Sequence, residues 1–213
     1  MIFMPAMSMI PTRTVKCLTD LKRTAECYTV ISECSLIHDA RNSAAALAIR
    51  NGFDRILWLD SDMMFDADLL ERLSADMNGA PERELVCGLY FKREIPTTPV
   101  IYRHLIEKQK PEDGSAPVYE PEIYFDYPLN AIFPVAACGF GAVLTRTDLL
   151  RRVWDKYGPP FDCLPGLGED LSFCLRAGQL SAGQYCDSAV KVGHLGPFCF
   201  GENLYMMNRN AAP

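Results

Sequence analysis

Two aspartates separated by a single residue are the clearest chemical feature of this 213-residue sequence. Asp60 and Asp62 follow the apolar run 55–59, which has the composition of a strand buried on both faces. Side chains alternate along an extended chain, so the two carboxylates should point the same way and approach one small ion. Oxygen ligands of this type suit Mg²⁺ or Mn²⁺, which keep coordination positions open for phosphate groups. The pattern therefore predicts a metal-assisted clamp for a diphosphate.

Three other interpretations of these acidic residues compete with the clamp. An EF-hand loop would need glycine where Phe65 stands, and a helix rather than a strand before it. Phosphatases of the haloacid-dehalogenase type also carry D-x-D after a strand, but their pattern expects Thr or Val where Met64 stands. In the third interpretation, acidic residues only cap the helix expected over 68–77. Capping does not require Asp60 and Asp62, so the clamp is favoured.

Three further groups of polar side chains stand where they could do chemistry. Arg41 offers a planar fork of donors for a phosphate or a sugar hydroxyl, and a surface ion pair with Asp39 is an equally good interpretation. Glu169 and Asp170 begin an expected helix, where acidic residues are common, yet the same position would project a carboxylate into a cleft. His194 lies in a tight Gly-rich turn; histidine joins carboxylates as a Mn²⁺ ligand, although a lone histidine is more often structural.

Alternating strands and helices in the first half of the chain are expected to position these residues. Such alternation is typical of βαβ units and a mostly parallel α/β sheet, whose ligands bind beyond the carboxyl ends of the strands. The expected elements are strands 2–4, 28–31, 55–59 and 84–90, with helices at 15–21, 40–51 and 68–77.

The second half is predicted to be mixed, because prolines punctuate short aromatic strands after residue 95. We expect strands at 100–102, 123–125, 140–144 and 189–192, an exposed turn at 108–116, and helices at 148–156 and 170–177. No linker separates the halves, so the prediction is a single domain over 1–213. Its halves are 1–94 on the nucleotide side and 95–213 on the acceptor side.

Composition limits the classes of partner. The net charge of −6 and a pI near 5.1 disfavour nucleic acid and anionic membranes, because both attract positively charged surfaces. The longest apolar stretch, 131–144, is too short and too rich in glycine and proline to span a bilayer. Nine cysteines form no C-x-x-C pair, and the N-terminal segment 1–11 lacks the basic region of a signal peptide. We therefore expect a cytoplasmic protein.

Five separate segments resemble glycosyltransferases of the GT-A fold, particularly small family-2-like members with a D-x-D motif. In chain order they are D-A-R-N at 39–42 before an Ala-rich helix, L-W-L-D-S-D-M-M-F at 57–65, G-F-G-A-V-L at 139–144, G-E-D-L-S-F at 168–173 and K-V-G-H at 191–194. Each motif alone is generic. The ordered set covers nearly the entire chain and is fairly specific.

The resemblance implies a transfer of sugar from a nucleoside diphosphate to an acceptor hydroxyl, with Mn²⁺ or Mg²⁺ as cofactor. It also assigns roles. The residues assigned to donor contacts are Pro5, Ala6, Arg41, Asn42, Asp60 and Ser61, and those assigned to metal ligation are Asp60, Asp62 and His194. Acceptor contacts are assigned to Gly139 and Phe140, and catalysis to Asp170 with Glu169. Asp170 is the general base if the transfer inverts configuration, and in a retaining transfer this acid orients donor or acceptor.

Two other functions stay open on the sequence alone. A nucleotide-sugar or glycan binding protein could keep this fold without turnover. A nucleotidyltransferase is disfavoured, because such enzymes usually carry a Gly-rich basic loop after the first strand and segment 4–13 has no glycine. The acidic pairs at 60–62 and 169–170 are expected in one cleft, where they would repel a bare diphosphate. The donor should therefore bind with metal, and weakly without it.

Overall fold

A sheet of seven strands, in the order β2-β1-β3-β10-β5-β11-β8, forms the centre of the protein. The computed structural model describes residues 1–23, 27–108, 117–197 and 199–211. The strands of this sheet are β1 (Ile2–Ala6), β2 (Thr29–Glu33), β3 (Arg55–Leu59), β5 (Arg83–Leu89), β8 (Ile132–Pro134), β10 (Ala142–Arg146) and β11 (Gly183–Lys191). β10 and β8 run antiparallel to their neighbours, and the others share one direction. The predicted α/β class with a mostly parallel sheet is confirmed.

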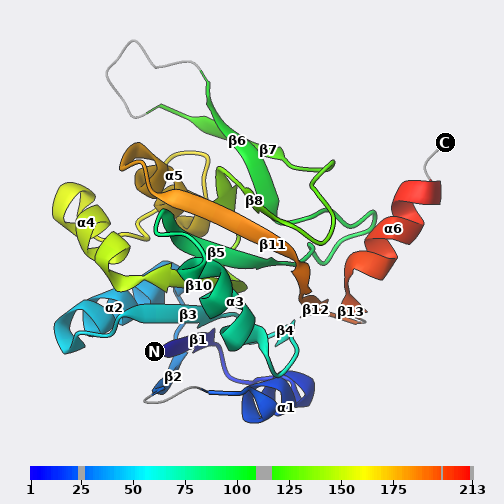
Figure 1. The fold of residues 1–213 in the computed structure, drawn as a ribbon, viewed down its shortest axis with the longest axis horizontal. Helices are drawn as coiled ribbons and strands as arrows, with labels where there is room; N and C mark the ends of the chain where they lie inside the picture. The colour runs from blue at the N-terminus through cyan, green and yellow to red at the C-terminus, as the bar shows by residue number, and fades with distance from the viewer. Residues whose placement is uncertain (24–26, 109–116, 198, 212–213) are drawn as a thin grey trace.

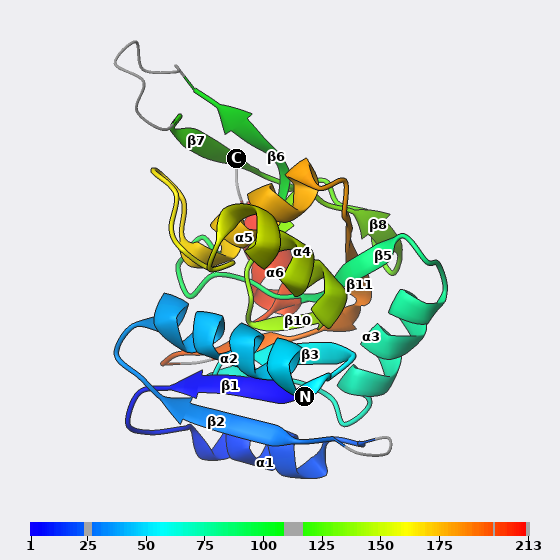
Figure 2. The same ribbon diagram turned by 90° about the vertical axis from the view of Figure 1, so that its left-hand side faces the viewer.

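Helices cover this sheet and flank it (Figure 1). They are α1 (Thr12–Asp20), α2 (Ile37–Asn51), α3 (Leu69–Asn78), α4 (Thr147–Tyr157), α5 (Glu169–Gln179) and α6 (Glu202–Ala211). α4 contacts both α2 and α5, and Figure 2 shows the three side by side in one layer. α3 packs against β5, β10 and β11. α6 lies on the side of the molecule away from α2 and α4 (Figure 1).

Two small sheets are added to the central one. In the first, β12 (Gly193–Leu195) pairs with β13 (Cys199–Phe200) and with β4 (Met63–Met64), so that His194 lies opposite Met63. In the second, β6 (Ile101–Glu107) pairs with β7 (Tyr119–Ile123) and β9 (Ala137–Cys138). β6 and β7 extend beyond the body as an arm (Figure 1). The first small sheet brings the histidine motif next to the aspartate motif.

An aromatic cluster lies between the sheet and the layer of helices. Trp58 is 1% exposed, and its ring packs 5.0 Å from Phe161 and 5.8 Å from Phe140, centroid to centroid. Phe173 of α5 stacks on Phe161 at 4.9 Å. The indole nitrogen of Trp58 donates to Thr145 Oγ1 at 2.9 Å, which satisfies its polar group inside the core. This cluster fixes α5 relative to the end of β3.

Most of the expected elements are found within a few residues of their predicted bounds. β1 continues through Pro5, where the sequence suggested a stop, because β1 pairs with β3 only at Ile2 and Phe3 and needs no donor from Pro5 on that side. α2 ends at Gly52, whose φ of 69° suits glycine, as the Asn51-Gly52 pair predicted.

Other bounds differ. The last strand of the sheet starts at Gly183, earlier than the predicted 189–192, and α6 was not predicted. The exposed turn expected at 108–116 falls, apart from its first residue, outside the described residues. Within the described ranges, the longest and most apolar helices still fall short of what a membrane crossing requires.

Candidate active site

A cavity of about 340 Å³ opens beyond the carboxyl ends of β1, β2 and β3. This is the edge of a parallel sheet at which ligands bind. Its lining comprises Pro5, Ala6, Met7, Cys34, Ser35, Ile37, Asp60, Ser61, Asp62, Arg93 and His194. Six residues singled out from the sequence therefore meet around one cavity, although 132 positions separate Asp62 from His194.

Arg41 lies under this cavity and joins two acidic motifs. Its side chain is 2% exposed; Nη2 donates to Asp60 Oδ1 and Nη1 to Glu169 Oε1, both at 2.7 Å. The guanidinium also lies over the ring of Phe140, 5.3 Å from its centroid. The surface pair with Asp39, weighed from the sequence, is wrong. Arg41 instead holds Asp60 and Glu169 in place, so any contact it makes with a phosphate would compete with two charge-assisted hydrogen bonds.

Asp62 and His194 contact each other in the lining of the cavity. His194 Nδ1 lies 2.9 Å from the carbonyl oxygen of Phe91, and its Nε2 lies 3.4 Å from Asp62 Oδ2. Arg93 Nη1 lies 2.9 Å from the same Asp62 oxygen. Burial alone would raise the pKa of Asp62, but His194 and Arg93 outweigh it, so the pKa is lowered. Asp62 therefore stays ionised at neutral pH.

The tautomer of His194 makes this pair suitable for a cation. A carbonyl oxygen can only accept, so Nδ1 carries a proton. Nε2 lowers the pKa of Asp62 when it also carries a proton and donates to the carboxylate, and without that proton it presents a lone pair to Asp62. In that second form two acceptors face each other, and a metal ion can take the place of the proton between them. Asp62 and His194 thus fit a divalent metal. Within the described residues, no group of three His, Cys, Asp or Glu side chains could hold an ion. Asp60, the third predicted ligand, has one oxygen bonded to Arg41.

Asp170, at the start of α5, is a second carboxyl group whose pKa is shifted. Burial raises its pKa to about 6, and the charges of Glu169 and Asp60 add to this, although Arg41 acts in the opposite direction. One oxygen, Oδ1, accepts the N–H of Leu171 at 2.8 Å. Glu169 is engaged by Arg41, whereas Asp170 has a pKa suited to taking up a proton near neutral pH. Of these two adjacent acids, Glu169 therefore holds Arg41, and Asp170 is the one suited to accept a proton.

The predicted site residues outside the described lining of the cavity are Arg41, Glu169, Asp170, Asn42, Gly139 and Phe140. The last three have structural contacts of their own. Asn42 donates to Asp162 Oδ1 at 2.9 Å and accepts the N–H of Phe161 at 2.8 Å, which ties α2 to the loop before α5. A Cβ on Gly139 would lie 2.0 Å from the hydroxyl of Tyr90, and Phe140 is 1% exposed. Packing accounts for these positions in the structure. Their predicted contacts with donor or acceptor stay predictions.

The sequence did not single out Arg93, or the residues after β2 that line the cavity, Cys34 and Ser35 among them. The position of Arg93 in the sequence could have indicated its place in the site. Lys92 and Arg93 come just after the buried strand β5, which runs in the same direction as β3. Basic side chains at that point belong at the same sheet edge as the aspartates. Cys34 and Ser35 follow the predicted second strand and could have been found in the same way.

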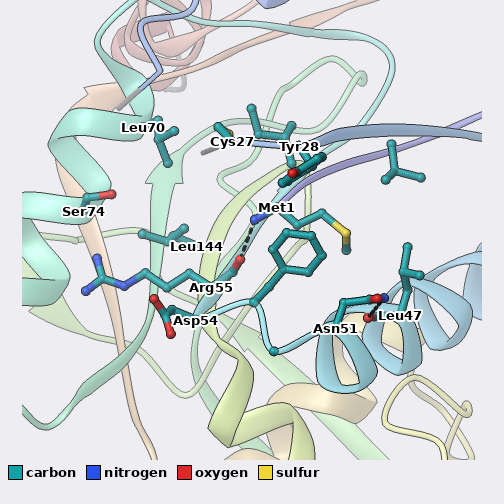
Figure 3. A pocket seen from close by; sticks show the side chains of 14 residues that line it. Met1, Cys27, Tyr28, Leu47, Asn51, Asp54, Arg55, Leu70, Ser74 and Leu144 are labelled. Atoms are coloured by element: carbon teal, nitrogen blue, oxygen red, sulfur yellow. Dashed lines mark hydrogen bonds between the residues drawn. The ribbon is translucent and has the colours of Figure 1, made fainter. Parts of the chain in front are cut away.

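A larger cavity of about 1010 Å³ lies at the other ends of the strands, lined by residues such as Met1, Tyr28 and Arg55 (Figure 3). Tyr28 and Phe53 meet edge to face at its rim, 5.6 Å apart. It contains none of the predicted site residues in its described lining. Its position at the amino ends of β1, β2 and β3 separates it from the candidate site.

Comparison with known proteins identifies the architecture. No protein-family model and no curated protein matches this sequence. Solved structures do match. A197 from STIV has a TM-score of 0.65 and 18% identity, covering 92% of this chain and 84% of that one. GalNAc-T7 in complex with UDP, GalNAc and Mn²⁺ has a TM-score of 0.57 and 10% identity, covering 92% of this chain and 42% of that one.

The chain has the GT-A fold. At these identities the similarity establishes architecture and no more. In this structure the D-x-D and K-V-G-H motifs meet at the cavity between β1, β3 and β12. The fold prediction is confirmed, and the chemistry must be argued from the site.

Proposed function

We propose that this GT-A protein is a metal-dependent glycosyltransferase that moves a sugar from a nucleoside diphosphate to an acceptor hydroxyl. The observation that carries the proposal is the facing pair of Asp62 and His194 Nε2, 3.4 Å apart at the carboxyl edge of the sheet. A carboxylate and an imidazole lone pair suit Mn²⁺ or Mg²⁺. The solved complex of GalNAc-T7 with UDP, GalNAc and Mn²⁺ supports the choice of donor class and metal.

Asp62 and His194 would hold the metal, which when bound supplies positive charge to the departing diphosphate. Pro5, Ala6 and Ser61 line the cavity where the nucleoside would lie. Asp60, fixed by Arg41, keeps its other oxygen for a hydroxyl of the ribose or sugar. These residues would bind and orient the donor.

Asp170 would act as the general base in a transfer that inverts configuration. With a pKa of about 6 it is ionised at neutral pH and can accept the proton of the attacking hydroxyl. Glu169 holds Arg41 and thereby positions Asp60, so its contribution is indirect. The acceptor would then be bound by the second half, on the side of α5 and β6.

A panel of UDP-, GDP-, CMP- and dTDP-sugars, each with and without Mn²⁺, tests the proposal by thermal shift. One donor should stabilise the protein only with Mn²⁺, by about 2.7 kcal/mol at a hundred times its dissociation constant. Slow hydrolysis of that donor should be lost in Asp62→Ala and Asp170→Asn. Asp155→Ala, an exposed position on α4, is the control and should keep both properties.

The outcomes of these measurements distinguish an enzyme from a binding protein. Stabilisation and hydrolysis that depend on Asp62 and Asp170 support the enzyme. Metal-dependent binding with no product would instead identify a nucleotide-sugar binding protein, and the glycosyltransferase assignment would be wrong. If no donor in the panel stabilises the protein with metal present, both assignments fail.

A further inference from the structure

Arg93 brings a positive charge into the candidate donor cavity from the loop after β5. Its side chain is about half exposed, and Nη1 makes a 2.9 Å ion pair with Asp62 Oδ2. A second, longer hydrogen bond runs from Nη1 to the carbonyl oxygen of Leu195 at 3.4 Å. Gly196 lies against the stem of Arg93, because a Cβ on Gly196 would stand 3.5 Å from its Cδ. Arg93 is thus placed by contacts at both its stem and its end.

Arg93 and His194 approach the same oxygen of Asp62. A divalent ion bound between Asp62 and His194 would need that oxygen and would repel the guanidinium. Since the side chain is half exposed, Arg93 has room to turn away from Asp62 without disturbing the core. The guanidinium would remain in the cavity lining, next to the place assigned to the diphosphate.

We propose that Arg93 is a diphosphate-binding residue that neutralises Asp62 in the metal-free protein and is released to the donor phosphates when metal binds. This inference rests on the proposed function, because it assigns Asp62 to the metal. A guanidinium presents paired donors that match two phosphate oxygens, which an ammonium cannot do as well. The metal and Arg93 would then contact the diphosphate together, while each excludes the other from Asp62.

Lys92 offers a matched control for Arg93. It is the preceding residue, carries the same charge, and pairs with Glu94 at 3.9 Å rather than with Asp62. It is absent from the described lining of the cavity. Arg93→Met and Lys92→Met therefore change the net charge equally, and only the first removes a charge from the site.

The test measures two affinities in each variant. The affinity for Mn²⁺ alone is obtained from the electron paramagnetic resonance signal of free Mn²⁺. The affinity for pyrophosphate at saturating Mn²⁺ is measured by calorimetry. Arg93→Met should bind Mn²⁺ several-fold more tightly, because a competing cation is gone. It should bind pyrophosphate about tenfold more weakly, the cost of one charge-assisted hydrogen bond. Arg93→Lys should bind pyrophosphate with intermediate affinity. Lys92→Met should match the wild type in both measurements.

The proposal requires that Arg93→Met both tightens Mn²⁺ binding and weakens pyrophosphate binding. Unchanged pyrophosphate affinity in Arg93→Met, or Mn²⁺ affinity that does not increase, overturns the proposal. Circular dichroism of each variant checks that the fold is retained. If Arg93→Met unfolds, the pyrophosphate affinity of Arg93→Lys, which keeps the positive charge, still tests the contact with phosphate. The probes carry no base or sugar, so failure of the nucleotide-sugar panel and failure of this inference are separate results.

Discussion

Arg41 shows how a single residue can organise a site without facing its ligand. It is among the largest fully buried side chains of the protein, and its two ion pairs connect the end of β3 to the start of α5. Burial raises the pKa of Asp60 even though the charge of Arg41 opposes this effect. Arg41 thus favours the ionised form of the carboxylate that would face the donor, against the effect of burial.

Arg41→Met is expected to destabilise the protein by about 3–5 kcal/mol, the usual effect of leaving buried partners of an ion pair uncompensated. Here two carboxylates, Asp60 and Glu169, would lose their shared cation. Urea denaturation at pH 8 measures the loss. The loss should shrink toward acid pH, because Asp60, whose pKa burial raises, can then take up a proton. Arg50→Ala, an exposed change on the same helix, should be nearly neutral, and equal losses in both variants would contradict the argument.

Asp170 sets the expected pH dependence of turnover. A general base works in its ionised form, so kcat should fall as the pH drops through about 6, the pKa that burial gives this carboxyl. Asp170→Asn should lower kcat at least a hundredfold and abolish this dependence. Asp155→Asn should keep the wild-type profile. A profile unchanged by Asp170→Asn would show that the base lies elsewhere.

At the scale of elements, the long strands and helices were predictable and the two-residue strands were not. Residues 55–59 could be identified as β3 because a continuous apolar run indicates a strand buried on both faces. β4 and β12 carry no such pattern; they form because the chain after β11 turns back and pairs His194 with Met63. The sequence therefore named His194 as a candidate, but only the structure shows that it meets Asp62.

The role of Arg41 was missed for the same physical reason. A motif in sequence shows which side chain is available, but not which partner it will find across the fold. Arg41 and Glu169 lie 128 positions apart, and their contact depends on how α2 packs beside α4 and α5. The glycines of the 139–144 segment are a second example of a partner that the motif does not reveal. The close neighbour of Gly139 is the side chain of Tyr90.

A carboxyl pair between α3 and β11 provides a test of element packing away from the site. Burial and the neighbouring Asp187 raise the pKa of Asp76 from 3.8 to about 6. A raised carboxyl pKa stabilises the fold while the group is protonated, so this contribution is full below about pH 4 and lost as the pH rises through 6. The interface between α3 and β11 should therefore be weaker at neutral pH.

Asp76→Asn removes this repulsion and is expected to raise the melting temperature at pH 7.5, with little change at pH 4. Thermal melts monitored by circular dichroism at the two pH values provide the comparison. Asp66→Asn, an exposed change just before α3, should have no effect at either pH. A gain for Asp76→Asn that is equal at both pH values would mean that protonation of this pair is not its cause.

For the molecule as a whole, the GT-A fold explains why the acidic residues gather despite their separation in sequence. The negative net charge of −6 excludes no local site, because Arg41 and Arg93 each compensate carboxylates at one edge of the sheet. The two halves expected from the sequence are joined there, through Arg41 with Glu169 and through Phe91 with His194. The site belongs to both halves.

This joining has a consequence for the order of folding. The contacts that complete the site close long loops: 128 positions separate Arg41 from Glu169, and 103 separate Phe91 from His194. Long loops close at a higher entropic cost, which favours their formation after the local βα units. A nascent chain that has emerged only as far as β5 would carry both aspartates without their distant partners. The proposed donor site is therefore complete only when the last strands have been synthesised.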